Sequence, residues 1–508
     1  MVLAFSHPVW TPARSDRGWT RGMPPPHCSP IRTASHVRAT LSEQAPPTPP
    51  VSAPPAPPST EDETVNAYVA RPPQTSPTSI DKLVAELGHD PRSGTSPLNS
   101  LLANPSDQTV SVHAGERVRT PLNLKAMLDA IHTPIVQSAT FTFRSTEDCI
   151  EYNRGTYQSY EYARYGNPTT RAVEEKVMAL DHAEDCVLSA SGMCAVTTML
   201  MALIPENGHI VVTTDCYRRT RQFITTVLPK MGIDCTVLDP ADMDGLRRVL
   251  ETRGADMYFS ESPTNPLIRV VDVAEISRIC RPHGTVSVID TTFATPVNFR
   301  PIDFGADLVL HSATKYLSGH QDVMCGALAG RADLIKKVKG MLGVMGGVVD
   351  PHVSFLISRG MKTLGVRMEA HNRNAAAVAE FLSRHPKVAK VHYPTLESHV
   401  DYEVGSRLFQ KGFGGVLSFE LRGNGDEWSR ETFEATGRFV DGLKIPYIGP
   451  SLGGCESLVE QVCIMGYFDQ PLKERKRLGI NNGLVRYSCG IEDTHDLVDD
   501  IEQALRFV

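Results

Sequence analysis

A lysine that follows two hydroxyl residues lies just after a short apolar run in the second half of the chain. The run DLVLH (Asp307–His311) is typical of a buried strand, and Ser312, Thr314 and Lys315 lie in the polar turn that follows it. Ligands of α/β proteins gather outside the carboxyl ends of strands, so this lysine is well placed to meet a phosphorylated ligand. The alternative is a lysine in an ordinary surface turn.

An aspartate that ends another apolar run favours the first interpretation. Asp290 closes the run TVSVID (Thr285–Asp290), about one βα unit before the lysine. A lysine amine that bonds to an aldehyde, an aspartate that pairs with a pyridinium nitrogen and hydroxyls that bind a phosphate are together what pyridoxal phosphate requires. We therefore expect Lys315 to carry this cofactor, with a pKa lowered by burial and neighbouring cations. Taken alone, Asp290 is equally well explained as the cap of the turn after its strand.

A strand–glycine–helix junction supplies a further candidate for the phosphate. The segment SASGMCA predicts a strand followed by a helix that begins at Gly192 and Met193. The free backbone N–H groups and positive dipole end of a helix N-terminus suit a phosphate group. Such a junction often only turns the chain, so its significance depends on its combination with Ser312 and Thr314.

Eight motifs, in order, resemble those of the Cys/Met-metabolism family of pyridoxal-phosphate enzymes. They are EYARYGNPTT, SASGMCA, DCYRRTR, ESPTNP, VIDTTFATP, HSATKYLSGH, PSLGGCES and LVRYSCGIED. The resemblance covers about residues 109–508 and is greatest to the plant and algal members. It implies an α/β, aspartate-aminotransferase-like (type I) fold, with a large, mostly parallel cofactor domain and a smaller C-terminal α/β domain that has a mainly antiparallel sheet.

The same resemblance implies roles for residues around the cofactor. Tyr162 and Arg164 resemble the pair that reaches the cofactor phosphate of a neighbouring subunit. Tyr217 resembles the catalytic tyrosine that stacks on the cofactor ring, and Asn265 the residue near its phenolic oxygen. From the residues alone, a core tyrosine and a surface ion pair explain Tyr162 and Arg164 as well.

Two residues near the C-terminus are candidates for binding the substrate. Arg486, in LVRYSCG, resembles the arginine that grips the α-carboxylate of an amino acid, which the forked guanidinium can do with two hydrogen bonds. Ser451, in PSLGG, resembles a second residue on the substrate side. The alternatives are a salt bridge at a strand edge and an ordinary turn serine.

Departures from other family members indicate the substrate. Arg218 and Arg219 stand where bacterial relatives have two glycines, Pro450 replaces an acid, and the cysteine of methionine γ-lyases is absent. Two cations beside the cofactor suit a substrate that has its own phosphate. If this segment is extended, side chains alternate and Arg219 lies on the same side as Tyr217. We therefore expect γ-replacement, in which O-phosphohomoserine and L-cysteine give cystathionine and phosphate in methionine biosynthesis.

Other functions remain compatible with these motifs. An acylated homoserine is the nearest alternative substrate, and cleavage of cystathionine or methionine by a γ-lyase is a second. A different class is an inactive homologue with a regulatory role. The last is disfavoured because Lys315, Asp290, Tyr217 and Arg486 are all present.

Composition excludes several classes of protein. The chain has 508 residues, 41% of them hydrophobic, and a net charge of −7, which argues against nucleic-acid binding. Its 11 cysteines are scattered without zinc-site spacing, so we expect neither a disulfide framework nor a metal. No apolar run approaches the roughly 18 residues of a membrane span. The partners that the resemblance implies are therefore small-molecule substrates, with no nucleic acid and no membrane.

Composition and periodicity also divide the chain. An Arg- and Ser-rich, acid-poor start predicts a plastid transit peptide at 1–60, for which the alternative is a disordered tail, and the Pro-rich 61–105 predicts a disordered linker. We expect an N-terminal arm at 106–169, the cofactor domain at 170–350 and the small domain at 351–508. The unpatterned aromatic residues of the arm need a surface to pack on, and the resemblance implies a homotetramer, a dimer of dimers.

Alternating apolar runs and helical patterns from Asp185 to Gly330 predict a mostly parallel sheet with helices on both faces. The chain should end in a helix capped by Thr494, with core positions at Leu497, Val498, Ile501, Ala504 and Leu505.

Overall fold

The computed structural model describes residues 106–116, 130–423 and 426–508, all of which belong to one compact unit, Val84–Val508. The expected transit peptide (1–60) and linker (61–105) lie outside the described residues. The arm, large-domain and small-domain boundaries remain predictions.

A seven-stranded sheet forms the centre of the large domain, in the order β1-β7-β6-β5-β4-β2-β3. Its strands are β1 (Asp185–Ser189), β2 (His209–Thr213), β3 (Asp234–Leu238), β4 (Met257–Glu261), β5 (Val286–Asp290), β6 (Leu308–Ser312) and β7 (Gly326–Gly330). Only β7 runs against its neighbours, β1 and β6, so the prediction of a mostly parallel sheet is confirmed.

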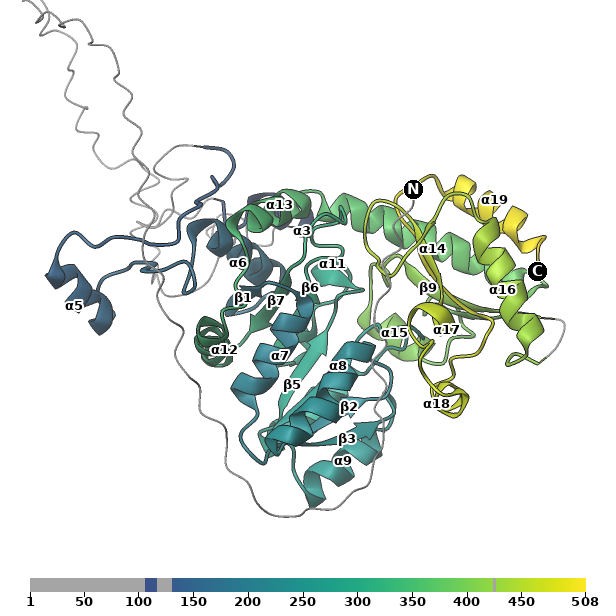
Figure 1. Ribbon diagram of the computed structural model, residues 1–508, viewed down its shortest axis with the longest axis horizontal. Coiled ribbons are helices and arrows are strands. Elements are labelled where there is room, and N and C mark those ends of the chain that lie inside the picture. Colours follow the sequence, from purple (N-terminus) through teal and green to yellow (C-terminus); the bar gives the residue numbers. More distant parts are fainter. Residues whose placement is uncertain (1–105, 117–129, 424–425) are drawn as a thin grey trace, which may run out of the picture. The chain divides into compact units, whose positions relative to one another are not determined.

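Helices cover both faces of this sheet (Figure 1). They are α6 (Pro168–Asp181), α7 (Gly192–Leu203), α8 (Arg218–Gln222), α9 (Met243–Thr252), α10 (Val273–Cys280), α11 (Thr295–Asn298) and α12 (Ala332–Met345). Successive residues of β2 show the division: Ile210 and Val212 pack in a core with α7 and α12, whereas Val211 packs in a core with α9 and α10. Burial on both faces explains why the strands are continuous apolar runs in the sequence.

The small domain contains a five-stranded sheet in the order β10-β11-β12-β9-β8. Its strands are β8 (Val388–His392), β9 (Val416–Leu421), β10 (Tyr447–Ile448), β11 (Leu458–Gln461) and β12 (Leu484–Ser488). Every pair except β10 with β11 is antiparallel, as expected. Its helices are α14 (Leu364–Arg384), α15 (Tyr402–Leu408), α16 (Arg430–Gly442), α17 (Val462–Met465), α18 (Leu472–Arg477) and α19 (Thr494–Leu505), and α13 (Pro351–Met361) precedes α14.

The final helix, α19, corrects one detail of the prediction. Its cap is Asp493, whose side chain accepts hydrogen bonds from the backbone of His495 and Asp496, while Thr494 is the first helical residue. The predicted core positions are confirmed, with Val498 partly buried and the other four fully buried. Asp and Thr are both good caps, and only the backbone geometry decides between neighbours.

The segment before α6 contains two short helices, α3 (Asp107–His113) and α5 (Thr146–Arg154). No side chain of α5 is buried, although a helix with an apolar stripe normally covers a core. An isolated antiparallel β-bridge between Thr140 and Tyr162 joins the stretch before α5 to the stretch after it.

Candidate active site

Lys315 lies in a tight turn at the carboxyl end of β6. Its backbone N–H donates to Ser312 O at 3.0 Å, and its Nζ donates to Ser451 Oγ of the small domain at 2.8 Å. Burial, and next to it the positive charge of Arg486, lower the pKa of Lys315 to about 8. At pH 7 about a tenth of this amine is therefore neutral, far more than for an ordinary lysine, and the neutral amine is the form that reacts with a carbonyl group.

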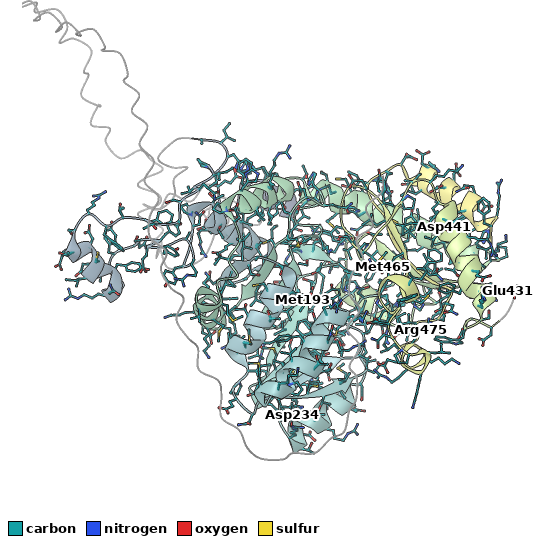
Figure 2. All side chains as sticks on the ribbon, viewed as in Figure 1. Met193, Asp234, Glu431, Asp441, Met465 and Arg475 are labelled. Carbon is teal, nitrogen blue, oxygen red and sulfur yellow. The ribbon has the colours of Figure 1, made fainter. Side chains whose placement is uncertain are left out.

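The N-terminus of α7 lies directly against Ser312. A Cβ atom on Gly192 would lie 3.0 Å from Cβ of Ser312, so any larger residue would push Ser312 away by a few tenths of an ångström. Ser191 caps the helix by accepting from the backbone of Cys194, and the N–H groups of Gly192 and Met193 have no acceptor within the helix. Figure 2 marks Met193 at this end of α7. Two free N–H groups beside a hydroxyl form a cradle that fits a phosphate.

The two predicted hydroxyls differ in their availability. The Thr314 hydroxyl accepts from the backbone N–H of Cys325 at 2.9 Å and lies 3.3 Å from the carbonyl of the same residue. Within the described parts of the chain, no hydrogen bond involves the Ser312 hydroxyl, while its backbone N–H donates to Thr292 Oγ1. Ser312 is therefore the freer phosphate ligand, and Thr314 holds the turn together.

Asp290 ends β5, the strand next to β6. Its Oδ1 accepts from the backbone and the hydroxyl of Thr292, at 2.9 and 2.6 Å, so it does cap the following turn. No described residue donates to Oδ2, which leaves that oxygen for a ligand. Burial raises the pKa of Asp290, whereas hydrogen bonds from Thr292 and the charge of His311 lower it. Turn cap and cofactor partner are thus compatible roles for one carboxylate.

A buried ion pair behind Asp290 was not foreseen from the sequence. His311 Nε2 lies 2.9 Å from Asp181 Oδ2, and their side chains are 1% and 0% exposed. The charge of Asp181 raises the pKa of His311 in spite of its burial. A cationic His311 favours the ionised form of Asp290, which is the form that pairs with a protonated ring nitrogen.

Tyr217 and Asn265 follow the carboxyl ends of β2 and β4. Tyr217 is 46% exposed, and its backbone N–H donates to Glu261 Oε1. Asn265 Oδ1 accepts from Arg486 Nη1 at 3.2 Å. Burial raises the pKa of Glu261 well above its usual range. Glu261 thus anchors the turn that carries Tyr217, a role that the motif ESPTNP did not reveal.

Arg486 lies on β12, the central strand of the small sheet, so it is not a strand-edge residue. Its Nη2 donates to Ser451 O at 3.1 Å and lies 3.1 Å from Glu460 Oε2. Together with Asn265, these contacts place the guanidinium between the two domains. Sequence reasoning missed Glu460, because its position opposite Arg486 depends on the pairing of β11 with β12.

The segment after Tyr217 is a helix, α8, so the premise of alternating extended side chains was wrong. Arg218 is the arginine that is held: its Nη1 donates to Gly466 O, and its Nη2 lies 2.6 Å from Asp469 Oδ2. Arg219 is exposed and bonds only to Gln222 Oε1, at 2.8 Å, among the described residues. Arg219 is thus the arginine available to a ligand, and the reason is that Gly466 and Asp469 hold Arg218, not an alternation of side chains.

Tyr162 and Arg164 do not contact the Lys315 site of their own chain. Arg164 Nη1 donates to Gly343 O of α12 at 3.0 Å, and its guanidinium lies over the rings of Tyr162 and Tyr165, at 5.3 and 5.0 Å from the centroids. Tyr162 is 42% exposed. No contact within the described residues joins either side chain to Ser312 or Lys315.

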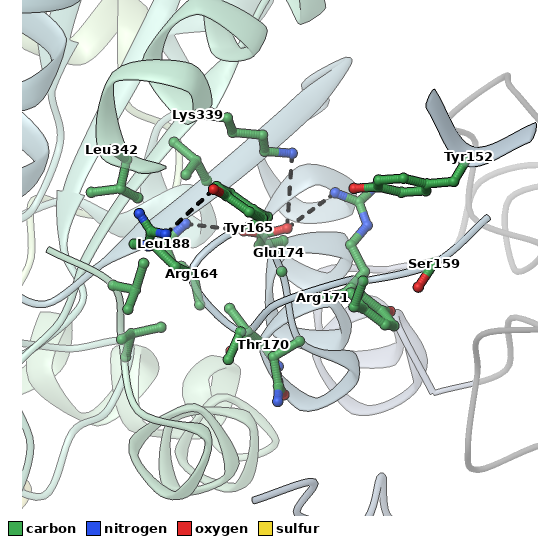
Figure 3. A pocket seen from close by; sticks show the side chains of 17 residues that line it. Tyr152, Ser159, Arg164, Tyr165, Thr170, Arg171, Glu174, Leu188, Lys339 and Leu342 are labelled. Atoms are coloured by element: carbon green, nitrogen blue, oxygen red, sulfur yellow. Dashed lines mark hydrogen bonds and ion pairs between the residues drawn. The ribbon is translucent and has the colours of Figure 1, made fainter. Parts of the chain in front are cut away.

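A cavity of about 270 Å³ lies beside Arg164, between the arm, α6 and α12 (Figure 3). Two of its cations are neutralised: Arg171 and Lys339 lie 3.2 and 3.9 Å from Glu174 Oε2 in the cavity wall, and 2.9 and 2.7 Å from the two oxygens of Asp185. The chemistry described above is not in this cavity. Among the described residues, no group of three or more His, Cys, Asp or Glu side chains is arranged to hold a metal. Within the same residues, no helix is both long and apolar enough to cross a membrane.

Comparison with known families agrees with this geometry. Residues 108–506 match the model of the Cys/Met metabolism PLP-dependent enzymes. The chain belongs to this family. Two chloroplastic cystathionine γ-synthases, from Nicotiana tabacum and Arabidopsis thaliana, are each 48% identical over 79% of the chain and over 72% and 69% of their own lengths. An L-methionine γ-lyase from Fusobacterium nucleatum is 35% identical over 78% of the chain and 97% of its own length.

Solved structures show the family fold. A cystathionine γ-synthase from Xanthomonas oryzae, in complex with aminoacrylate and cysteine, matches with a TM-score of 0.72 and 32% identity over 80% of this chain and 98% of its own. A metB structure from Corynebacterium glutamicum matches with a TM-score of 0.71 and 33% identity, also over 80% and 98%. The fold is therefore the type I fold that the motifs implied, and the cofactor of the family is pyridoxal phosphate.

The residues of this chain fit that cofactor. The cradle of Gly192, Met193 and Ser312 suits its phosphate, the open oxygen of Asp290 its ring nitrogen, and the neutral amine of Lys315 its aldehyde. These three positions come from the ends of β1, β5 and β6, which meet at one edge of the sheet.

Proposed function

We propose that the chain makes cystathionine by γ-replacement: O-phosphohomoserine and L-cysteine are joined through sulfur, and phosphate is released. The observation that carries the proposal is the meeting of Lys315 with Ser451 and Arg486, which places a reactive amine beside a carboxylate-binding fork. An amino acid is the substrate that uses both groups. The greater identity to the plastid γ-synthases than to the γ-lyase supports synthesis rather than cleavage.

Lys315 moves the protons of the reaction. When bound, pyridoxal phosphate accepts the negative charge that develops as bonds to the substrate carbons break. Once the substrate amine has displaced it, Lys315 would take the proton from Cα, pass it to the bound cofactor and only then take the proton from Cβ; after the thiol has added at Cγ, the same transfers would run in reverse. A pKa of about 8 suits a group that must both accept and donate protons near neutral pH.

Arg486 and its neighbours orient the substrate. The guanidinium binds the α-carboxylate, and Asn265 and the carbonyl of Ser451 hold the fork in place from two sides. The Ser451 hydroxyl holds the Lys315 amine at 2.8 Å, which keeps the base at the substrate end of the site. Tyr217 covers the exposed face of the cofactor ring.

Arg219 acts on the leaving group. A departing phosphate carries two negative charges, and a nearby guanidinium stabilises the charge that develops in the transition state. Arg219 has this freedom because, within the described residues, its only polar partner is the neutral side chain of Gln222. Arg218 is held by Asp469 and serves instead to join α8 to the small domain.

A second subunit completes each site, and the assembly is a homotetramer of two dimers. Tyr162 and Arg164 lie on an exposed arm and contribute to the cofactor phosphate of a partner. The protein acts in the plastid stroma and loses roughly the first 40 to 100 residues on import, a range set by composition. Cell fractionation tests this: a full-length protein in the cytosol would contradict it.

Product analysis tests the proposed reaction. The purified protein is given L-cysteine with O-phosphohomoserine or O-acetylhomoserine, and in separate assays cystathionine or methionine alone. We expect cystathionine and stoichiometric phosphate from the first pair. Equal rates with the acetyl ester would assign an acylated substrate, ketoacid from cystathionine or methionine alone would assign a lyase, and no turnover by a protein that binds the cofactor would indicate a regulatory homologue.

A further inference from the structure

Glu460 is a buried acid at the substrate end of the site, and its function is not explained by the roles given above. It lies on β11 directly opposite Arg486 on β12. Its Oε2 is 3.1 Å from Arg486 Nη2, and the two side chains are 7% and 8% exposed. A carboxylate with so little contact with solvent needs a lasting positive partner.

The guanidinium of Arg486 has few donors left for a ligand. Nη1 donates to Asn265 Oδ1, and Nη2 donates to Ser451 O while facing Glu460. Asn265 and the Ser451 carbonyl are neutral, so Glu460 is the one charged partner of Arg486 among the described residues. A substrate carboxylate that binds this fork must share it with Glu460.

Two buried carboxylates on one guanidinium leave a net negative charge. The charged groups facing Glu460 are Arg486 on the neighbouring strand and Lys315 in the turn after β6. In the holoenzyme Lys315 would be bonded to the cofactor and would no longer be a free ammonium group, so Arg486 is the charged side chain that stays paired with Glu460. Uptake of one proton by Glu460 removes the excess charge and keeps a hydrogen-bonding group beside the fork.

We propose that Glu460 is the positioning residue for Arg486, and that it takes up a proton when a substrate carboxylate binds to the same guanidinium. This rests on the carboxylate-binding role given to Arg486 in the proposed function. In the empty site, the charged Glu460 aligns the guanidinium of Arg486. In the filled site, Glu460 is protonated and no longer competes with the substrate carboxylate for that guanidinium. Carboxylate binding becomes proton-coupled as a result.

The sign of the coupling follows from the environment of Glu460. Burial raises the pKa of Glu460, and the charges of Arg486 and Lys315 oppose that shift only in part. A bound carboxylate raises the pKa further, because it adds a negative charge nearby. Protons are therefore taken up on binding, and affinity falls as pH rises above the pKa of Glu460 in the empty site.

The test uses butanoate, which has the carboxylate and carbon skeleton of the substrate but no amine. It is titrated into the holoenzyme at a series of pH values across the range in which the holoenzyme stays folded. Binding is followed by the change in cofactor absorbance, and proton uptake by calorimetry in buffers with different ionisation enthalpies. Neither readout depends on turnover.

We expect the wild type to take up as much as about one proton per butanoate at pH values between the pKa of Glu460 in the empty site and its higher pKa in the filled site, with affinity falling by up to about tenfold per pH unit there. Glu460→Gln keeps a hydrogen-bonding group without the charge, so it should bind butanoate more tightly at high pH and take up about one proton fewer. Other groups that titrate in this range contribute to both proteins, and the difference between them reports Glu460.

Two further variants keep the test decisive. Glu460→Asp retains the charge and should retain the pH dependence, while Glu420→Gln makes the same substitution in an acid of the same sheet that bonds to His392 and should behave as wild type. Equal proton uptake by the wild type and Glu460→Gln overturns the proposal. Unchanged butanoate binding in Arg486→Gln overturns instead the role of Arg486 in the proposed function.

Discussion

The Lys315 centre and the arm that carries Arg164 are built in opposite ways. At the centre, Lys315, Ser451 and Arg486 are linked by hydrogen bonds of 2.8 and 3.1 Å, and burial alters the pKa of the lysine. On the arm, Tyr162 is 42% exposed and α5 buries no side chain. The hydrogen bonds among Lys315, Ser451 and Arg486 form within one chain, whereas the arm leaves aromatic residues exposed, as our proposal of a second copy that packs on it requires.

Removal of the amine at the centre should have the largest effect. We expect Lys315→Ala to lose activity by about 10⁴-fold, the upper range for a group that transfers protons, together with the absorbance of the lysine-bound cofactor. Borohydride reduction and mass spectrometry should place the cofactor on Lys315 in the wild type. Lys337→Ala, on the exposed surface of α12, is the matched control. A reduced cofactor on another lysine would show that the centre lies elsewhere.

Mixing inactive chains tests whether the arm acts across subunits. Arg164→Ala should lose activity by about 10³-fold, the effect of one well-placed donor. After subunit exchange with Lys315→Ala, roughly a quarter of the sites regain both residues if two-fold symmetric partners share them. A mixture of Lys315→Ala and Asp290→Ala is the control without rescue, since both belong to one centre. If the Arg164 mixture also stays inactive, the arm serves its own chain.

Arg219 extends the comparison to an exposed residue beside the centre. We expect Arg219→Gly to lower kcat/KM for O-phosphohomoserine by about 10²-fold and to leave O-acetylhomoserine nearly unchanged, because the ester develops less charge. Arg218→Gly is the control: it breaks the contact with Asp469 and should affect both substrates alike. Equal losses for both substrates in Arg219→Gly would assign that arginine to the cofactor or the fold.

The lowered pKa of Lys315 also means that this buried lysine destabilises the folded, cofactor-free protein. The folded pKa of about 8 lies below the ordinary value of 10.5, so the folded cofactor-free protein holds the lysine proton less tightly than the unfolded chain does. Lys315 therefore destabilises the folded protein by the full amount below about pH 8. This destabilisation decreases as the pH rises from about 8 to 10.5, the pKa of the lysine in the unfolded chain. Lys315→Met should therefore stabilise the cofactor-free protein by about 3 kcal/mol at pH 7, and by less at higher pH. Denaturant unfolding at several pH values measures this, and a constant difference would contradict it.

The smallest effect is expected from the N-terminal 100 residues. They hold eight basic and eight acidic side chains (8 − 8 = 0), so removing them leaves the net charge at −7. We expect a chain that begins near residue 101 to keep the kcat, KM and solubility of the full chain. A changed KM would contradict this expectation and would show that the N-terminal segment affects substrate binding.

Much of the centre was predictable because strand-end chemistry is local. The run before Ser312, the glycine at the start of α7 and the acid that ends β5 are each read from a few neighbouring residues. Parallel strands then bring these ends to one edge of the sheet without further information. Arg218 and Arg219 show the limit of this method, because four or five residues do not distinguish a helical turn from an extended segment.

The amino-acid sequence by itself determined the order of strands and helices along the chain, and it was enough to propose Lys315 as the lysine that carries the cofactor and Gly192, Met193 and Ser312 as the cradle for its phosphate. Tertiary structure decided which charges meet: Glu460 with Arg486 across two strands, Asp181 with His311 behind Asp290, and Arg218 with Asp469 between the domains. The physical reason is the separation along the chain over which each kind of interaction acts. Local propensity and apolar periodicity act over a few residues, whereas these pairs join positions from 26 to 251 residues apart, and only the packed sheets bring them within hydrogen-bonding distance.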